Sequence, residues 1–581
     1  MRRWLIWLLF LSSLGGMYGS TFVDNWERSR NPYIFEGDMR VFNPYYQRVR
    51  DPELFKGFYE LEYNYGLANS GYRALFESVA RFTDPVGFAK TWPFVGLIGV
   101  LVVLGMAAVR LVGLSGAWGV VALALSSGFL FQSMAGGNPR SFAYPLTALA
   151  IYALVAGRIY ILAGVVVLGA LFYVMMGLLY GVCMATVLLL LPERDRGDAV
   201  SWSLQRRMVF MIGVGALCAA FLLPQLRDFH VHYGQGFALE ACDTIPEIGM
   251  RGRIGSESAC APQMPLFEQI LQQSVHAIRL TYGATPWSVT LHEWGRFSLK
   301  NRVGGLSRDE LLVVMLWMFS GIMTLIRAIR ARESALRRLL ALLAISCLAH
   351  EAAIALLPNL YFPNRYLYPI GPLFLLFIVV AAHEFAQRVA NRLPMFRAAW
   401  SAPGCILGVT GICLLLLGSS GSPHAGLKVD RQQYAPLYQF VETLPKDARI
   451  AGWPKGILED LPLLARRANF VSHEHHSAFH LKYIQEMRHR TFALVDAYFA
   501  TTLAPLIHLR DGYGVTHLLL EKPLFEKGTL RHFSPFIERA EANREAGRAA
   551  GFEAMRQIPH AGVFDFDRYV ILDLARLREP G

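Results

Sequence analysis

An acidic side chain stands among cations in a polar stretch between the first two hydrophobic segments. Asp38 is followed by Arg40, Arg48 and Arg50 within residues 21–91. A group-transfer reaction needs a base to take a proton from an acceptor hydroxyl and cations to hold a phosphate leaving group. We predict Asp38 as the base, and Arg40 and Arg48 as phosphate ligands. Charge pattern alone favours a simpler interpretation, in which these are solvated loop charges that pair with one another.

Two further arginines are candidates for phosphate binding because of where they stand. Arg140 and Arg365 lie in short proline-containing loops, Asn138-Pro139-Arg140 and Pro363-Asn364-Arg365, at predicted ends of membrane spans. A lipid headgroup phosphate lies at that depth, and a guanidinium donates two parallel hydrogen bonds to phosphate oxygens. The alternative is that both side chains simply snorkel to bulk lipid phosphates.

The composition places these residues in a membrane protein. The chain has 581 residues, of which 54% are hydrophobic and 17% charged, and a mean hydropathy of +0.33. Such a chain is too apolar for a soluble protein of this size. A span takes about 20 apolar residues, and we expect about 11 of them. The predicted spans are 4–20, 93–113, 117–135, 142–157, 159–174, 176–191, 208–225, 309–327, 338–357, 367–386 and 402–419.

The distribution of basic residues predicts the orientation. With Arg2 and Arg3 in the cytoplasm, the basic short loops alternate onto that side when residues 159–191 are read as a hairpin that turns near Met175 to Gly177. Three large segments then lie outside: loop 21–91, loop 226–308 and the tail after residue 420. A cleaved signal peptide at the N-terminus is an alternative that leaves these sides unchanged.

Net charge and composition also limit the partners. The net charge of +12 fits this topology and contact with the lipid bilayer, and no basic surface interleaved with aromatic residues indicates nucleic acid. The sequence does not indicate a protein partner. Residues 1–420 are expected to form the transmembrane domain.

The tail, residues 421–581, has ordinary polarity and is expected to form an extracytoplasmic α/β domain. Its predicted strands are 448–453, 468–472, 515–520 and 564–574, with an amphipathic helix over 481–499.

Several other residues carry chemistry of their own. Cys242 and Cys260 lie in loop 226–308, where an oxidising compartment allows a disulfide. His350 and Glu351 fall near the middle of a predicted span, where ionisable groups are costly and usually face a cavity or a partner. The histidine-rich run 473–480 fits a polar surface better than a metal site, and we predict no metal ligands there.

Short motifs in order along the chain resemble a family of bacterial polytopic membrane proteins that is similar to the C-type (GT-C) membrane glycosyltransferases. The motifs are Gly37-Asp38-Met39-Arg40, Gln47 to Phe55, Ser70 to Leu75, Asp84-Pro85, Gly137 to Pro145, Phe362 to Tyr366 and Thr443 to Ala448. The resemblance implies a polyprenyl-phosphate-linked sugar donor, the bacterial inner membrane, and an acidic residue in the first extracytoplasmic loop, where Asp38 stands. It also implies a cavity to which Glu36, Tyr366, His350 and Glu351 are candidate contributors.

The chain departs from that family pattern at two places. Relatives often carry Gln-His where this chain has Val41-Phe42, and a second acid where it has Phe58; Glu36, Glu53 and Glu60 are candidate substitutes. A divalent metal is left open, since Asp38 alone does not require one. The expected function is transfer of a sugar from a polyprenyl phosphate to a glycan, lipid or protein. The alternatives are a non-catalytic scaffold of envelope polysaccharide assembly and a transporter that uses His350 and Glu351.

Overall fold

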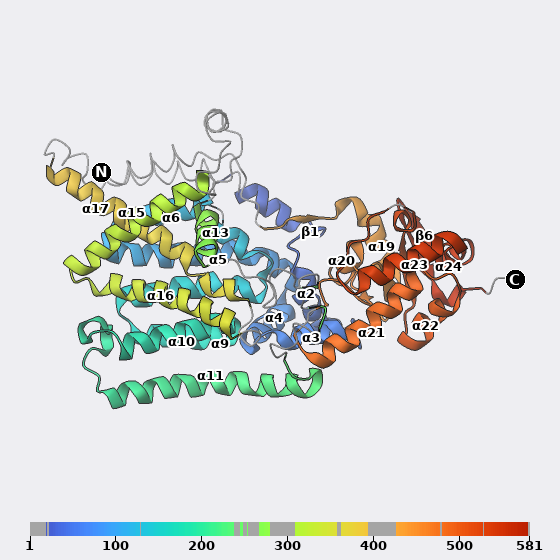
Figure 1. The fold of residues 1–581 in the computed structure, drawn as a ribbon, viewed down its shortest axis with the longest axis horizontal. Coiled ribbons are helices and arrows are strands. Elements are labelled where there is room, and N and C mark those ends of the chain that lie inside the picture. The colour runs from blue at the N-terminus through green and yellow to red at the C-terminus, as the bar shows by residue number, and fades with distance from the viewer. Residues whose placement is uncertain are drawn as a thin grey trace.

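The computed structural model describes most of the chain. The described residues are Gly19 and 22–127, 129–236, 245–247, 252–253, 266–278, 308–356, 362–392, 426–476, 479–526 and 528–578. Cys242, Cys260, the expected span 402–419 and nearly all of the span 4–20 lie outside them. Figure 1 shows a helical bundle on one side, the C-terminal region on the other, and elements of the first loop between the two.

The bundle is built from apolar helices. Its helices are α5 (Pro85–Val112), α6 (Leu114–Ser127), α7 (Phe129–Ser133), α8 (Ala143–Ala156), α9 (Ile159–Phe172), α10 (Val174–Leu189), α11 (Leu204–Tyr233), α13 (Leu266–Ile278), α15 (Arg308–Arg330), α16 (Ser334–Ala355) and α17 (Ile370–Arg392). Among the described residues, four helical segments are long and apolar enough to cross a membrane, or five if α6 and α7 form one bent span. The chain is therefore a multi-pass membrane protein, while the expected number of about 11 spans stays a prediction.

Residues 159–191 fold as two helices, as predicted. The break falls at Tyr173, between α9 and α10, slightly before the predicted turn. The two helices approach closely because glycines face one another: a Cβ placed on Gly169 would lie 2.4 Å from the backbone of Gly177. Each helix has only 14 or 16 residues, which explains why this stretch is too long for one span and short for two.

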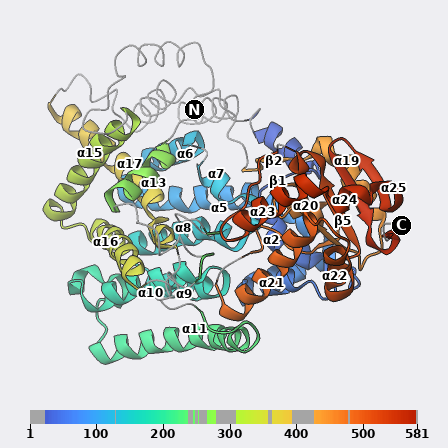
Figure 2. The same cartoon turned by 45° about the vertical axis from the view of Figure 1, so that its right-hand side comes forward.

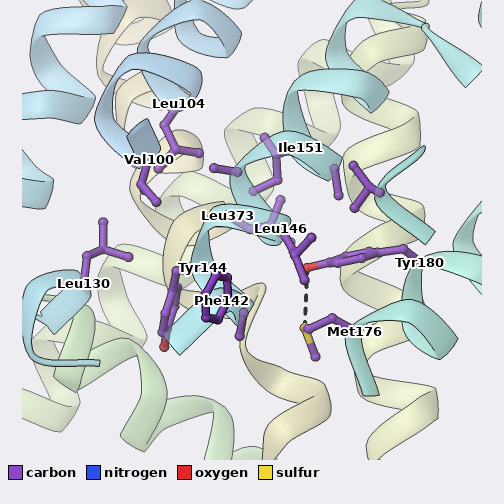
Figure 3. Close-up of a cluster of buried hydrophobic side chains, with 14 of the residues drawn as sticks. Val100, Leu104, Leu130, Phe142, Tyr144, Leu146, Ile151, Met176, Tyr180 and Leu373 are labelled. Atoms are coloured by element: carbon purple, nitrogen blue, oxygen red, sulfur yellow. Dashed lines mark hydrogen bonds between the residues drawn. The ribbon is translucent and has the colours of Figure 1, made fainter. Parts of the chain in front are cut away.

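Tight packing of large side chains fills the centre of the bundle. Figure 3 shows Val100 and Leu104 of α5 facing Ile151 of α8, with Leu373 of α17 beside them. The hydroxyl of Tyr180 is hydrogen bonded to that of Thr147 at 2.6 Å and also contacts the sulfur of Met176 at 3.6 Å. A buried hydroxyl without a partner would cost free energy, so these bonds let Tyr180 fill the core.

The first loop is folded into short elements at the end of the bundle. They are β1 (Ile34–Phe35), α2 (Met39–Phe42), η1 (Pro44–Val49), α3 (Tyr59–Leu67) and α4 (Ser70–Phe82). β1 pairs antiparallel with β2 (Val429–Asp430), at the start of the C-terminal region. In the turned view of Figure 2, α2 lies among the helices of the C-terminal region, and it packs against α20 (Ile457–Leu464).

The C-terminal region is a three-layer α/β structure. Its strands β3 (Arg449–Gly452), β4 (Ala468–Asn469), β5 (His517–Glu521), β6 (Gly562–Phe566) and β7 (Tyr569–Asp573) form one sheet in the order β4-β3-β5-β7-β6. β3, β4 and β5 are parallel, and β6 and β7 are antiparallel to their neighbours. The helices α21 (Leu481–Tyr498) and α22 (Ala504–Tyr513) cover one face, and α19 (Ala435–Thr443) and α20 (Ile457–Leu464) the other. Further helical elements are η9 (Gln432–Tyr434), η10 (Lys522–Phe525), α23 (Phe536–Ala550), α24 (Glu553–Arg556), α25 (Ile558–Ala561) and η11 (Leu574–Arg576).

The α/β prediction for this region is confirmed, with one correction. The strands predicted at 448–453, 468–472 and 515–520 and the helix over 481–499 are present as β3, β4, β5 and α21. The last predicted strand, 564–574, is instead a hairpin of β6 and β7. The chain turns between Phe566 and Tyr569, where Asp567 adopts a left-handed φ of 54°.

The close contact of α9 and α10 yields a stability prediction. Gly169→Ala should lower the free energy of unfolding by about 1–3 kcal/mol, because the new methyl group has to displace the backbone of Gly177. Gly164→Ala on the same helix is the matched control, since nothing lies within 4 Å of its Cβ position. Thermal unfolding in detergent measures both; equal melting temperatures would contradict the prediction.

Candidate active site

Asp38 and Glu36 meet one guanidinium from the bundle. The Arg140 Nη2 atom lies 2.8 Å from Oδ2 of Asp38 and 3.2 Å from Oε1 of Glu36. The backbone N–H of Asp38 donates to Oε2 of Glu36 at 2.9 Å. Asp38 and Arg140 keep about a third of their side-chain surface exposed, while Glu36 is mostly buried. This trio, formed by the predicted base, a predicted cavity residue and a predicted phosphate ligand, is partly open.

Local backbone geometry brings Arg140 to the loop. Gly136 and Gly137 of η2 (Ala135–Gly137) both have positive φ, 78° and 56°. A Cβ on Gly136 would lie 2.6 Å from Oε2 of Glu36, so only glycine allows this approach. Asn138 then caps the turn η3 (Pro139–Phe142), where its Oδ1 accepts from the N–H of Ser141 at 3.2 Å.

Arg365 stands near the same trio. It lies in η7 (Pro363–Leu367) and donates from Nη1 to the hydroxyl of Tyr173 at 2.9 Å. Its guanidinium carbon is 4.2 Å from the ring centroid of Phe362. The rings of Tyr173 and Tyr368 are 6.3 Å apart, and Arg365 is near enough to Arg140 for the two cations to repel one another. An anion between the two guanidinium groups would relieve that repulsion.

Burial changes the acidity of Glu36. Its poorly solvated position raises the pKa to about 8; the neighbouring Asp38 carboxylate also raises it, and Arg140 lowers it. Glu36 therefore holds a proton more readily than an exposed carboxyl does. The two acids of the site have different environments, because Glu36 is mostly buried and Asp38 is more exposed.

Solved structures show what this arrangement of bundle, loop and C-terminal region is similar to. No protein-family model and no curated protein matches the chain. ArnT from Cupriavidus metallidurans, bound to undecaprenyl phosphate, is 12% identical with a TM-score of 0.51, over 98% of this chain and 97% of that one. This chain has a GT-C-like fold. The likeness to ArnT covers nearly all of both chains, so the bundle and the C-terminal region share it.

Archaeal oligosaccharyltransferases align more loosely. That of Archaeoglobus fulgidus in the apo form is 11% identical with a TM-score of 0.45, over 94% of this chain and 73% of that one. AglB from the same organism, in complex with an inhibitory peptide and a dolichol-phosphate, is 9% identical with a TM-score of 0.43, over 87% and 69% of the two chains.

The other two predicted phosphate ligands have different partners. Arg40 contacts three carboxylates of the C-terminal region: Asp460 at 2.8 Å, Glu474 at 3.2 Å and Glu459 at 3.3 Å. Arg48 lies 3.6 Å from Glu62 and 5.2 Å from the ring centroid of Tyr45. The predicted arginines therefore divide: Arg140 and Arg365 gather at the Asp38 site, and Arg40 and Arg48 pair with carboxylates elsewhere.

The remaining candidates lie around the site or away from it. Tyr366 is buried in the bundle core. His350 is buried on α16, its Nδ1 3.2 Å from Oε1 of Glu351, and α16 packs against η7. Of the candidate second acids, Glu53 is exposed and accepts from Lys56, whereas Glu60 is fully buried 3.8 Å from Arg490 of α21.

The roles of two tyrosines and one asparagine at the site were not predicted from the sequence. Tyr173 and Tyr368 lie beside Arg365, and Asn138 fixes the turn before Arg140. The asparagine-proline pair before Arg140 is a cap signal that could have identified Asn138. Tyr173 and Arg365 are 192 residues apart. A separation of that length does not predict their contact.

The part of the chain that the structure describes contains no group of three His, Cys, Asp or Glu side chains placed to hold a metal ion. The ring Nδ1 atoms of His473 and His532 lie 3.4 Å apart, as a pair. A cavity of about 780 Å³ opens in the C-terminal region beside Phe440, Arg510 and Arg576. It includes none of the predicted site residues, and both of its arginines are paired, with Asp511 and Asp573.

The different partners of Arg40 and Arg48 predict different contributions to stability. Arg40→Met should cost about 3–5 kcal/mol of unfolding free energy, because it leaves the buried Asp460 and Glu459 without this cation. Arg48→Met should change it by less than about 0.5 kcal/mol, because its ion pair is long and partly exposed. Chemical denaturation in detergent measures the free energy of unfolding of both variants. An equal decrease in the two would contradict the larger contribution predicted for Arg40.

Proposed function

We propose that the chain is an integral membrane glycosyltransferase that moves a sugar from a polyprenyl-phosphate-linked donor to an extracytoplasmic acceptor. The observation that carries the proposal is the cluster in which Arg140 contacts Asp38 while Arg365 stands nearby. It unites a partly exposed carboxylate and two guanidinium groups at the end of an apolar bundle. The GT-C-like fold, shared with an ArnT structure that holds undecaprenyl phosphate, supports the donor class.

The residues of the site suit each part of such a transfer. A hydroxyl oxygen of the acceptor attacks the anomeric carbon of the sugar, and the bond from that carbon to the phosphate oxygen breaks. The proton of the hydroxyl passes to a carboxylate oxygen of Asp38, and the electron pair leaves with the polyprenyl phosphate. Arg140 and Arg365 hold the phosphate and neutralise the charge that develops on it.

Arg140 is expected to exchange partners during this reaction. In the structure its Nη2 contacts both Asp38 and Glu36. A donor phosphate would take over part of this guanidinium, which leaves Asp38 freer to accept a proton. Because burial raises the pKa of Glu36 to about 8, this carboxyl carries less negative charge near pH 7 to oppose the incoming phosphate than an exposed one would.

The orientation expected from the basic loops supports a reaction on the extracytoplasmic face of the bacterial inner membrane, with the N-terminus in the cytoplasm. The site lies between the bundle and the C-terminal region (Figure 1), which puts that region on the same face. The donor lipid would enter from the bilayer and the acceptor from the aqueous side. The acceptor class stays open among glycans, lipids and proteins.

Release of polyprenyl phosphate tests the reaction class and the base together. Purified protein is given a panel of polyprenyl-phosphate sugars and candidate acceptors, and Asp38→Asn should lower the rate about 10²–10⁴-fold through loss of the proton acceptor. Asp24→Asn, which changes an exposed carboxylate of the same loop, is the matched control and should keep the wild-type rate.

Each outcome of this assay is informative. Equal rates for wild type and Asp38→Asn would remove Asp38 as the base. No release by either, from folded protein with acceptors present, would favour the scaffold alternative.

The raised pKa of Glu36 predicts a pH effect on donor binding. As pH rises through about 8, Glu36 loses its proton and places a second negative charge beside Asp38. The KM for the donor should therefore increase above that pH. Glu36→Gln cannot ionise and should give a flat profile over the same range, measured as KM at intervals from below to above pH 8. A wild-type rise that persists in Glu36→Gln would assign the effect to another group.

A further inference from the structure

The C-terminal region holds both ends of the short segment that carries the two acids. We call residues 34–40 the acid strip. At its start, β1 pairs with β2, with Ile34 opposite Asp430 and Phe35 opposite Val429. Just before it, the backbone N–H of Arg431 donates to the carbonyl of Tyr33 at 2.9 Å.

The far end of the acid strip is held by a buried carboxylate. Arg40 donates from Nη1 to Oδ1 of Asp460 at 2.8 Å. The other oxygen of Asp460 accepts from Nε of Arg431 at 2.7 Å and from the hydroxyl of Tyr438 at 3.3 Å. Asp460 is fully buried, so its charge depends on these partners.

One residue therefore connects the two ends. The backbone of Arg431 binds the chain before the strip, and its side chain binds the carboxylate that holds Arg40. Between these two anchors, Glu36 and Asp38 reach Arg140 of the bundle. The strip is thus fixed at both ends by the C-terminal region and in its middle by the bundle.

We propose that Asp460 is a positioning residue for Asp38, so that the C-terminal region sets the geometry of the active site. This rests on the proposed function. Arg40 is two residues from Asp38, and Asp38 is the N-terminal cap position of α2, so a change in the direction of Arg40 turns the backbone that carries the base. Misplacing a reacting group by about 1 Å can cost about 10²-fold in rate. Asp460 itself touches neither donor nor acceptor in this scheme.

The test combines a structural readout with a kinetic one. Asp460→Asn keeps the shape of the side chain and removes its charge. Backbone amides of residues 34–42 should exchange hydrogen about ten-fold faster, as expected when a local element opens more often. The kcat should fall about ten-fold or more, while the KM for the donor changes less than about two-fold, because Arg140 and Arg365 stay in place.

Glu553→Gln is the matched control. Glu553 is also a buried carboxylate of the C-terminal region, and it is paired with Arg556 at 2.8 Å within that region. Its replacement should leave both the exchange of residues 34–42 and the kcat unchanged. Equal effects from the two variants would show general destabilisation and overturn the proposal.

A milder variant guards against loss of folding. Tyr438→Phe removes only the 3.3 Å bond to Asp460 and should shift exchange and kcat in the same direction by a smaller factor. Unchanged exchange, or faster exchange with unchanged kcat, in either folded variant overturns the positioning role. If wild type releases no polyprenyl phosphate, the proposed function fails and this role fails with it; exchange then still reports whether Asp460 holds the strip.

Discussion

Charged groups at the end of an apolar bundle need partners. Residues 36–40 of the first loop pair both with the bundle and with the C-terminal region. Glu36 and Asp38 face Arg140 of the bundle, while Arg40, two residues further on, faces carboxylates of the C-terminal region. Removing Arg40 would leave the buried carboxylates of Asp460 and Glu459 without this cation, at a cost larger than the net gain from most single hydrogen bonds. The positions of bundle, loop and C-terminal region are therefore coupled through this alternation of acid and base along residues 36–40.

The need for charged partners also distinguishes two arginines that look alike in the sequence. Arg40 and Arg48 follow Asp38 in one polar stretch, and charge pattern ranks them equally. The structure gives Arg40 three carboxylates and Arg48 a single long ion pair. Arg140 and Arg365 were predicted from their positions at the ends of apolar segments, and they stand in η3 and η7, just before the bundle helices α8 and α17. Their meeting with Asp38 and Tyr173 depends on helix packing across more than a hundred residues, which no spacing reports.

Secondary-structure elements that depend on local sequence pattern were predicted well, whereas breaks and turns inside apolar stretches were not. Periodicity identified β3, β4, β5 and α21, because alternation and helical repeats are local. It joined β6 and β7 into one predicted strand, because apolar residues stand on both sides of the turn at Asp567. The length of the apolar run and the basic loops predicted two helices in residues 159–191 but placed their break slightly late, because Tyr173 is itself apolar enough to continue either helix. The number of spans depends on helices shorter than a bilayer crossing, where hydropathy loses resolution.

The pairing of β1 with β2 has a consequence for the order of synthesis. Asn31 donates to Gln432 across 401 residues, and Arg40 reaches Asp460 across 420. The loop is made early and emerges next to its bundle, but these contacts become available only after about 400 further residues have been translated. At about 5–20 residues per second, tens of seconds pass between the synthesis of Glu36 and Asp38 and that of Gln432 and Asp460. A chain that stalls or is cut before this point holds all of the predicted chemical groups of the site but lacks the contacts that order them.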